Sequence, residues 1–137
     1  MQHDQFIGRV QDRAKLASRG DAERATRATL ETLGERIPGG LAENIAGQLP
    51  QEIGEHLCRT GGPEDSAERF DVSGFITRVR DRAGGSVDEP QAVYLARVVF
   101  EITDEATQGR LAERVREALP EGLEGVLSKG STDTASQ

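Results

Sequence analysis

One stretch of the chain constrains the fold more than any other, because it is written twice. Residues 6–14 read Phe-Ile-Gly-Arg-Val-Gln-Asp-Arg-Ala, and residues 75–83 read Phe-Ile-Thr-Arg-Val-Arg-Asp-Arg-Ala. A match this dense is improbable by chance and indicates a tandem duplication. An internal repeat constrains the architecture more strongly than any local pattern does. We therefore predict two related halves built from the same succession of elements.

The two halves are expected to share one core. The chain has 137 residues, of which 35% are hydrophobic and 30% are charged, a composition typical of a soluble globular protein. A chain of this length buries one sizeable core rather than two independent ones. Neither half is therefore expected to fold alone.

The charge of the chain argues against nucleic acid as a partner. The formal net charge is −7, whereas proteins that bind a phosphate backbone draw their affinity from clustered cations. Nearly all the cations are arginines, and Lys15 and Lys129 are the only lysines. We interpret this bias as the codon usage of a GC-rich prokaryote and expect a bacterial source.

The sequence predicts a cytoplasmic protein. Cys58 is the only cysteine, so an intrachain disulfide is impossible and a secreted disulfide scaffold is excluded. The first residues show no basic segment followed by an apolar one, as a signal peptide would. No window approaches the roughly 18 apolar residues of a transmembrane helix, so we expect no membrane association.

Apolar residues at helical spacing predict four helices in each half. The duplicated stretch places its apolar residues on one face of a first helix, with Asp4 and Ser73 as the predicted N-caps. The second helix is predicted over residues 19–37 and again over residues 89–106. The second of these segments alone could pass for a strand, but its counterpart in the first half is rich in alanine and charged helix formers, so both are predicted to be helical.

The remaining helices are shorter. The second helices have Ser18 and Asp88 as predicted N-caps. Third helices are predicted over residues 41–49 and 111–119, each stopped by a proline, and a short fourth helix follows each one. The predicted fold is all-α: a tandem duplication of a four-helix repeat, packed into one compact helical domain with pseudo-twofold symmetry.

The domain boundaries follow from this pattern. The predicted division is residues 1–58 for the first repeat, 59–71 for a linker, 72–128 for the second repeat and 129–137 for a disordered tail. The linker contains Gly-Gly-Pro and a polar run, and the tail has no apolar periodicity.

These features resemble a known family. The paired Phe-Ile-x-Arg-Val-x-Asp-Arg-Ala helices, the segment at 27–36 and the run Gln-Leu-Pro-x-Glu-Ile at 48–53 are similar to the prokaryotic family called domain of unknown function 2267. The resemblance extends through Leu127 and is stronger in the first repeat, since Ala118 and Gly122 replace the usual glutamine and glutamate. It implies a small, all-helical cytoplasmic protein of two repeats, and it implies no catalytic residues.

Charged residues that recur in both repeats are candidates for a ligand site or an ion-pair network. They are Arg9, Asp12, Arg13, Arg27, Glu31, Glu35 and Glu43, with their mates Arg78, Asp81, Arg82, Arg97, Glu101, Glu105 and Glu113. Arginine before glutamate is the less favourable order within one helix, so we expect partners on another helix, the arginines of the first helix in particular. A lattice of inter-helix ion pairs is the simpler interpretation, and an arginine-lined site for a small anion or acidic peptide is the alternative.

Two further patterns are weak as functional signals. His56 and Cys58 form the only cluster of nucleophilic or soft-ligand character, but two ligands do not make a structural zinc site. Residues 41–57 superficially resemble a helix-turn-helix, yet Glu52 and Glu55 on the second helix would repel phosphates. We therefore expect neither a metal site nor DNA binding.

The second helix of the second half carries extra apolar residues, which make it a candidate interface. Val93, Val98 and Phe100 lie outside the stripe that its counterpart shows. Such a helix is either central to the fold or covered by another subunit. We expect burial within a monomer, and a homodimer through this helix is the alternative.

The sequence contains no acid–base pair, metal set or nucleophile motif, so we expect a protein that is not an enzyme and has no cofactor. The leading hypothesis is a non-enzymatic protein-interaction or regulatory module with an unidentified protein partner. The alternative is a binder of a small acidic ligand through the repeated arginines.

Overall fold

Residues 1–60, 70–84 and 87–115 are described by a computed structural model, in which every regular element is a helix. The helices are α1 (His3–Ala14), α2 (Arg19–Arg36), α3 (Gly39–Ala46), α4 (Gln51–Arg59), α5 (Val72–Ala83), α6 (Glu89–Ala106) and α7 (Arg110–Val115). The predicted all-α class is confirmed. The predicted fourth helix of the second half, the tail and most of the linker lie outside the described residues.

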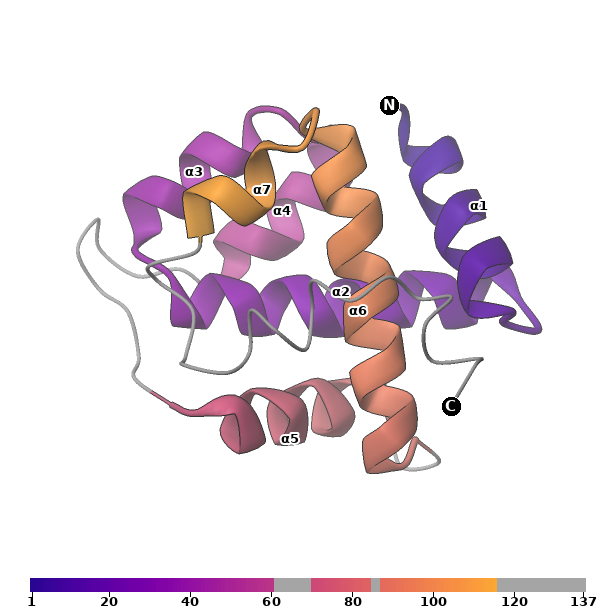
Figure 1. Ribbon diagram of the computed structural model, residues 1–137. Helices are drawn as coiled ribbons and strands as arrows, with labels where there is room; N and C mark the ends of the chain where they lie inside the picture. The colour runs from indigo at the N-terminus through magenta and orange to yellow at the C-terminus, as the bar shows by residue number, and fades with distance from the viewer. Residues whose placement is uncertain (61–69, 85–86, 116–137) are drawn as a thin grey trace.

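The two longest helices, α2 and α6, cross at the centre of the molecule and contact each other (Figure 1). Helix α1 packs against both of them, and so does α5. Helices α3 and α4 pack together beside α2, while α7 contacts α6 and α3. Each half therefore sends its first helix onto the long helix of the other half.

The core draws on both halves of the chain. Its largest fully buried side chains are Phe6, Phe75, Ile7, Leu30, Leu33, Ile37, Ile45, Ile53, Leu57, Ile102 and Leu111. They belong to one continuous cluster that runs from α1 to α7. The expectation of a single shared core agrees with this cluster.

The N-caps of the long helices are confirmed, but those of α1 and α5 are not. The side chains of Ser18 and Asp88 accept hydrogen bonds from backbone amides three residues on, at 3.1 and 2.9 Å. Asp4 and Ser73 were the wrong choice, because each helix begins earlier. Asp71 caps α5 by accepting from the amide of Gly74 at 2.9 Å.

Helix α1 begins after Gln2, whose backbone amide donates to Oε1 of Gln5 at 3.0 Å. This leaves the Asp4 carboxylate in the first turn, where it accepts a hydrogen bond from Arg19 at 2.6 Å. The third helix is likewise shorter than predicted, because α3 ends at Ala46 and Leu49 lies in the turn that precedes Pro50. Pro50 restricts only Leu49, the residue before it, whereas α3 already ends with Gly47 as its C-cap.

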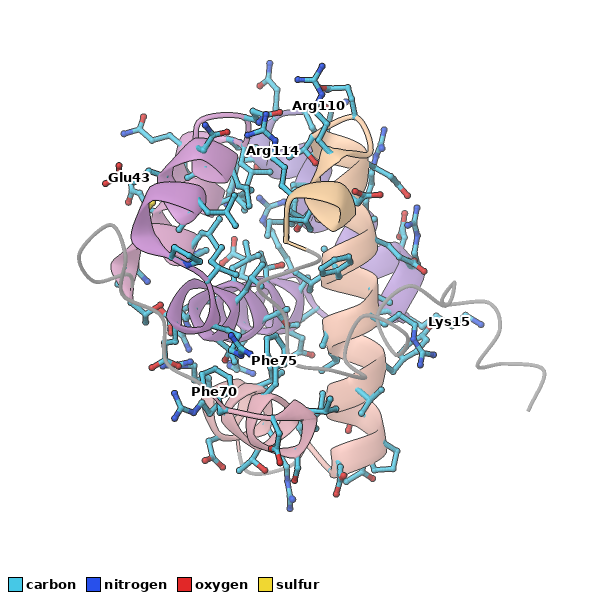
Figure 2. All side chains as sticks on the ribbon, turned by 60° about the vertical axis from the view of Figure 1, so that its left-hand side comes forward. Lys15, Glu43, Phe70, Phe75, Arg110 and Arg114 are labelled. Atoms are coloured by element: carbon cyan, nitrogen blue, oxygen red, sulfur yellow. The ribbon has the colours of Figure 1, made fainter. Side chains whose placement is uncertain are left out.

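Phe70 connects the start of α5 to the end of α2 through packing and hydrogen-bond contacts. Figure 2 shows Phe70 beside Phe75, and their ring centroids are 6.3 Å apart. The guanidinium of Arg78 lies 4.0 Å from the centroid of the Phe70 ring, a cation–π contact. From α2, Arg36 Nε donates to the backbone oxygen of Phe70 at 3.1 Å. These contacts set where the second half begins on the surface of the first.

A glycine allows α4 to lie close against α2. A Cβ added to Gly34 would fall 2.1 Å from the backbone oxygen of Leu57, a distance that real Cβ atoms do not reach. Only hydrogen fits at that point, so the spacing between the two backbones depends on this residue. Both helices also contribute residues to the cleft described below.

Replacing Gly34 by alanine is therefore predicted to destabilise the fold by about 2 kcal/mol or more, because α4 must move away from α2. Gly8 is the matched control, since a Cβ there meets nothing within 4 Å. Gly8→Ala should stabilise α1 by up to about 1 kcal/mol through helix propensity. Urea denaturation of both variants measures the difference, and equal effects of the two substitutions would contradict the close packing.

The first half expressed alone, as residues 1–60, is predicted not to fold cooperatively. Its α1 would lose its contact with α6, and its α2 would lose both α5 and α6. The measurement is thermal unfolding followed by circular dichroism, together with the dispersion of amide signals in an NMR spectrum. A cooperative transition with dispersed amide shifts would show that the halves do not depend on a shared core.

Candidate functional site

The charged residues shared by both repeats meet at two contacts between helices, and the first joins α1 to α6. Arg13 lies 2.7 Å from a carboxylate oxygen of Glu105 and 3.3 Å from one of Glu101. Arg9 approaches Glu105 at 3.5 Å. The hydrogen bond with Glu105 raises the pKa of Arg13. This contact therefore holds the first helix of one half on the long helix of the other.

The second contact joins α5 to α2 in the reciprocal way. Arg82 lies 2.7 Å from Glu35 and 3.5 Å from Glu31, and Arg78 lies 3.3 Å from Glu35. Burial by itself would raise the pKa of Glu35, but hydrogen bonds and charge from Arg82 and Arg78 outweigh it, and the pKa falls below its ordinary value. Arg82 also donates to Thr32 Oγ1 at 2.8 Å.

The other members of the predicted set lie elsewhere. Asp12 and Asp81 are exposed and take no part in the ion pairs of the described residues. Arg97 on α6 is buried, with 8% of its surface exposed, whereas Arg27 on α2 is exposed. The structure therefore does not gather the repeated arginines into one site, and Arg9, Arg13, Arg78 and Arg82 are already engaged by carboxylates of the chain.

The candidate interface on α6 is mostly inside the molecule. Val98 is 0% exposed and Phe100 is 7% exposed, while Val93 is half-buried and packs against the core. Val98 and Phe100 are thus buried within the chain itself, which is the first of the two arrangements expected for them. The extra apolar residues fit the central place of α6, which contacts α1, α2, α5 and α7.

His56 and Cys58 sit in different surroundings despite their proximity on α4. Burial raises the pKa of Cys58, and the negative charge of Glu43 adds to this effect, so the thiol stays protonated and is a weak nucleophile. Burial lowers the pKa of His56, and Arg59 and Arg27 lower it further against an opposing effect of Glu31. His56 is thus neutral at physiological pH.

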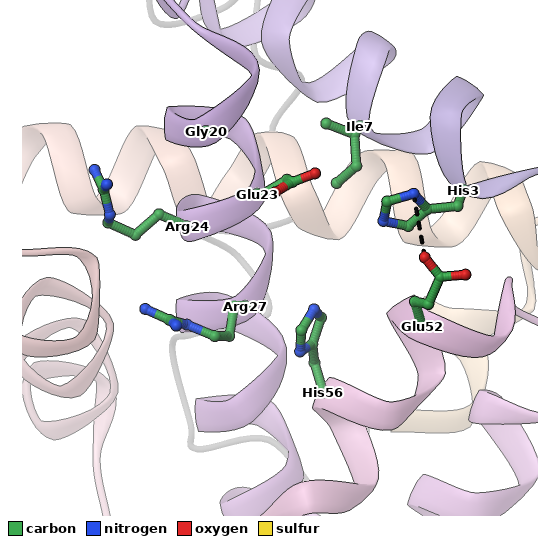
Figure 3. A pocket seen from close by; sticks show the side chains of 8 residues that line it. All are labelled: His3, Ile7, Gly20, Glu23, Arg24, Arg27, Glu52 and His56. Carbon is green, nitrogen blue, oxygen red and sulfur yellow. Dashed lines mark ion pairs between the residues drawn. The ribbon is translucent and has the colours of Figure 1, made fainter.

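A cleft of about 510 Å³ opens between α1, α2 and α4 (Figure 3). It is lined by His3, Ile7, Gly20, Glu23, Arg24, Arg27, Glu52 and His56. Both histidines of the protein lie in it. We call this feature the histidine cleft.

The lining of the histidine cleft combines positive, negative and neutral polar groups. Arg24 and Arg27 project from neighbouring turns of α2, and Glu52 from α4 faces His3 from α1 (Figure 3). The Nδ1 atom of His3 lies 3.5 Å from Glu52. Such a set of side chains binds polar ligands by hydrogen bonds and charge, with Ile7 as an apolar contact.

Sequence reasoning missed the histidine cleft, although a signal for it existed. At the matched positions of the second repeat, the sequence has Val72 for His3, Val93 for Glu23, Tyr94 for Arg24 and Val126 for His56. The repeat accepts apolar residues in those places, so the helical pattern does not demand the polar ones. In the second repeat Val72, Val93 and Tyr94 pack against the core, whereas Glu23 and Arg24 of the first repeat are exposed, so these polar residues are free to take a role specific to the first copy.

Comparison with known families identifies the chain. A family model described as "Uncharacterized conserved protein (DUF2267)" matches residues 3–126. The chain belongs to this family. No curated protein matches the chain. Membership of the DUF2267 family assigns no role to any residue, so the function has to be argued from the site itself.

Two further observations bear on the chemistry of this DUF2267 protein. In the described ranges, no group of three or more histidine, cysteine, aspartate or glutamate side chains is arranged to hold a metal ion. The helices of those same ranges also include none with the length and apolar character needed to cross a membrane.

The lowered pKa of Glu35 predicts how stability depends on pH. The carboxylate is stabilised in the folded state, so its contribution is complete above the ordinary pKa of glutamate and is lost as the pH falls through the lower, folded-state value. Glu35→Gln should therefore destabilise the protein at pH 7 and lose less stability than wild type on acidification. Urea denaturation from pH 7 to about pH 3 measures this difference.

The matched control for Glu35→Gln is Glu55→Gln, which removes an exposed carboxylate of α4. This variant should follow the wild-type pH dependence closely. If the Glu35 and Glu55 variants lost stability in parallel with wild type on acidification, the pairing of Glu35 with Arg82 would make no contribution to the fold.

Proposed function

We propose that this protein is a non-enzymatic interaction or regulatory module, and that it recognises its partner at the histidine cleft. One observation carries the proposal. The cleft concentrates His3, Glu23, Arg24 and His56, each of which is replaced by an apolar or aromatic residue at the matched position of the second repeat. Since the helical repeat does not require these polar groups, binding is the reason that we assign to them.

The cleft also has the dimensions and the mixed surface of a binding site. Its volume of about 510 Å³ falls within the range of roughly 300–1,000 Å³ that ligand pockets occupy. The neutral His56 and the protonated Cys58 thiol support a binding role over nucleophilic chemistry. We propose that the module acts in the cytoplasm, because its single cysteine cannot form the intrachain disulfides on which many small secreted domains rely.

The alternative function, a binder of small acidic ligands through the repeated arginines, has less support. Within the described part of the chain, Arg13 and Arg82 each pair with two carboxylates, and Arg9 and Arg78 each pair with at least one. An anion would have to displace these glutamates and leave partly buried negative charge without a partner, which is costly. The reciprocal ion pairs are thus better explained as contacts that hold the halves together.

We also propose that the fold is a tandem duplication of a four-helix repeat with a pseudo-twofold relation. The ion pairs support it, because Arg13 with Glu105 and Arg82 with Glu35 occupy matched positions with the halves exchanged. Residues related by the repeat also meet: Arg114 on α7 donates to Asn44 on α3. Contact between a residue and its own counterpart is characteristic of a twofold axis.

Affinity capture tests the proposed binding face. The full chain serves as bait in three forms: wild type, a double variant carrying Arg24→Tyr and His56→Val, and an Arg80→Gln control on the exposed face of α5. The double variant carries the residues that the second repeat has at those positions. We expect a partner that wild type and control retain and that the double variant binds about 10-fold or more weakly.

Matching thermal stability of the three baits is required, so that lost capture reports the cleft and not unfolding. A set of captured proteins identical for all three baits would refute the assignment of the binding face to the histidine cleft.

A further inference from the structure

The charges in the histidine cleft are separated in space. Arg24 and Arg27 come from α2 and lie together at one end (Figure 3). Glu52 and its neighbour His3 lie at the other end, and Glu23 points between them toward Ile7. The cleft therefore has a cationic end and an acidic end, with the imidazole of His56 between them.

These charged groups are only weakly committed to partners within the chain. Glu52 is 67% exposed and its distance to His3 is 3.5 Å. Glu23 and Arg24 are about half exposed, and each pairs with a near neighbour on α2 at 3.4 and 3.3 Å. Exposed pairs of this kind contribute little to stability, so a ligand can replace them at little cost.

Arg27 is the most available cation of the cleft. Its side chain is exposed, and no ion pair joins it to any of the residues that the structure describes. Its guanidinium offers a planar fork of donors that suits a carboxylate. By contrast, Glu31 and Glu35 are only 13% and 17% exposed within the contact between α5 and α2.

We infer that the histidine cleft binds a small dipolar ligand, with a free carboxylate at one end and an ammonium group at the other. This inference rests on the proposed function, because it names the chemistry recognised at the same site. Arg27 and Arg24 receive the carboxylate, and Glu52 and Glu23 receive the ammonium. A simple anion would meet repulsion from the glutamates, and a simple cation would meet it from the arginines.

A free amino acid and a short peptide share this chemistry, and the volume of about 510 Å³ accommodates either. His56 suits the region between the two charged ends, because Arg59 donates to its Nδ1 atom at 3.2 Å and thereby leaves the Nε2–H group of the neutral imidazole as a donor. A carbonyl oxygen of a peptide backbone can accept that hydrogen bond. Ile7 provides the apolar contact for a small side chain.

The two histidines make the test direct, since both line the cleft and the protein has no others. Their imidazole signals in two-dimensional NMR report binding without any label on the ligand. The probes are L-alanyl-L-alanine, its N-acetyl form without the ammonium, and its C-terminal amide without the carboxylate. L-alanine, with its own two blocked forms, distinguishes a free amino acid from a peptide.

We expect saturable shifts of both histidine signals with an unblocked probe at constant pH, and about 10-fold or more weaker binding when either end is blocked. Arg27→Gln should weaken binding of the unblocked probe and leave binding of the C-terminal amide unchanged. Glu52→Gln should weaken binding of the unblocked probe and leave binding of the N-acetyl form unchanged. Arg80→Gln, outside the cleft, is the control and should bind like wild type.

Two results would overturn the inference. One is a blocked probe that binds as tightly as its unblocked parent, which would mean that the cleft recognises a single charge. The other is the absence of any histidine shift with all probes. In both cases the affinity capture decides separately whether the cleft is a binding face, so failure of the ligand class is distinguishable from failure of the proposed function.

Discussion

The crossing of α2 and α6 is the contact on which the rest of the structure depends. At least half of the residues of each helix are buried, including Ala22, Leu30 and Leu33 on α2 and Ala92, Val98 and Ile102 on α6. Helices α1 and α5 each rest on both of them. Burial of apolar surface between the halves supplies the driving force, at about 25 cal/mol for each Å² removed from water.

The ion pairs orient this packing more than they drive it. Arg13 and Arg82 reach from the first helix of each half to the carboxylates of the opposite long helix. Partly buried pairs lose in desolvation much of what they gain by attraction, but removing one partner leaves a charge with no counterion. The pairs therefore penalise misplacement of α1 on α6 or of α5 on α2, and they specify one arrangement of the halves.

Much of the helical architecture could be predicted from local chemistry. The predicted second helices, over residues 19–37 and 89–106, match α2 and α6 to within one residue. Serine and aspartate caps mark their starts unambiguously. The cap of α5 was misplaced because Asp71 and Ser73 are both capping residue types and stand close together. The cap of α1 was misplaced because its N-cap is Gln2, a residue type that capping preferences do not favour.

The candidate site was harder to predict than the fold. The histidine cleft joins His3, Arg27 and Glu52 from three helices, and no spacing along the sequence places them together. The apolar excess on α6 around Phe100 pointed to burial, but the sequence left a homodimer open as the alternative, because the burial depends on how four other helices surround α6. Local sequence patterns indicate whether a segment is a helix and which of its faces is buried, whereas clefts and interfaces arise only when the elements assemble.

Native-state hydrogen exchange measures most directly whether the crossed long helices hold both halves in one cooperative unit. The most protected amides of α2 and α6 should open with the same free energy, equal to that of global unfolding, and should respond equally to urea. A substantially lower opening free energy for one long helix would mean that its half unfolds separately, and this result would contradict the account.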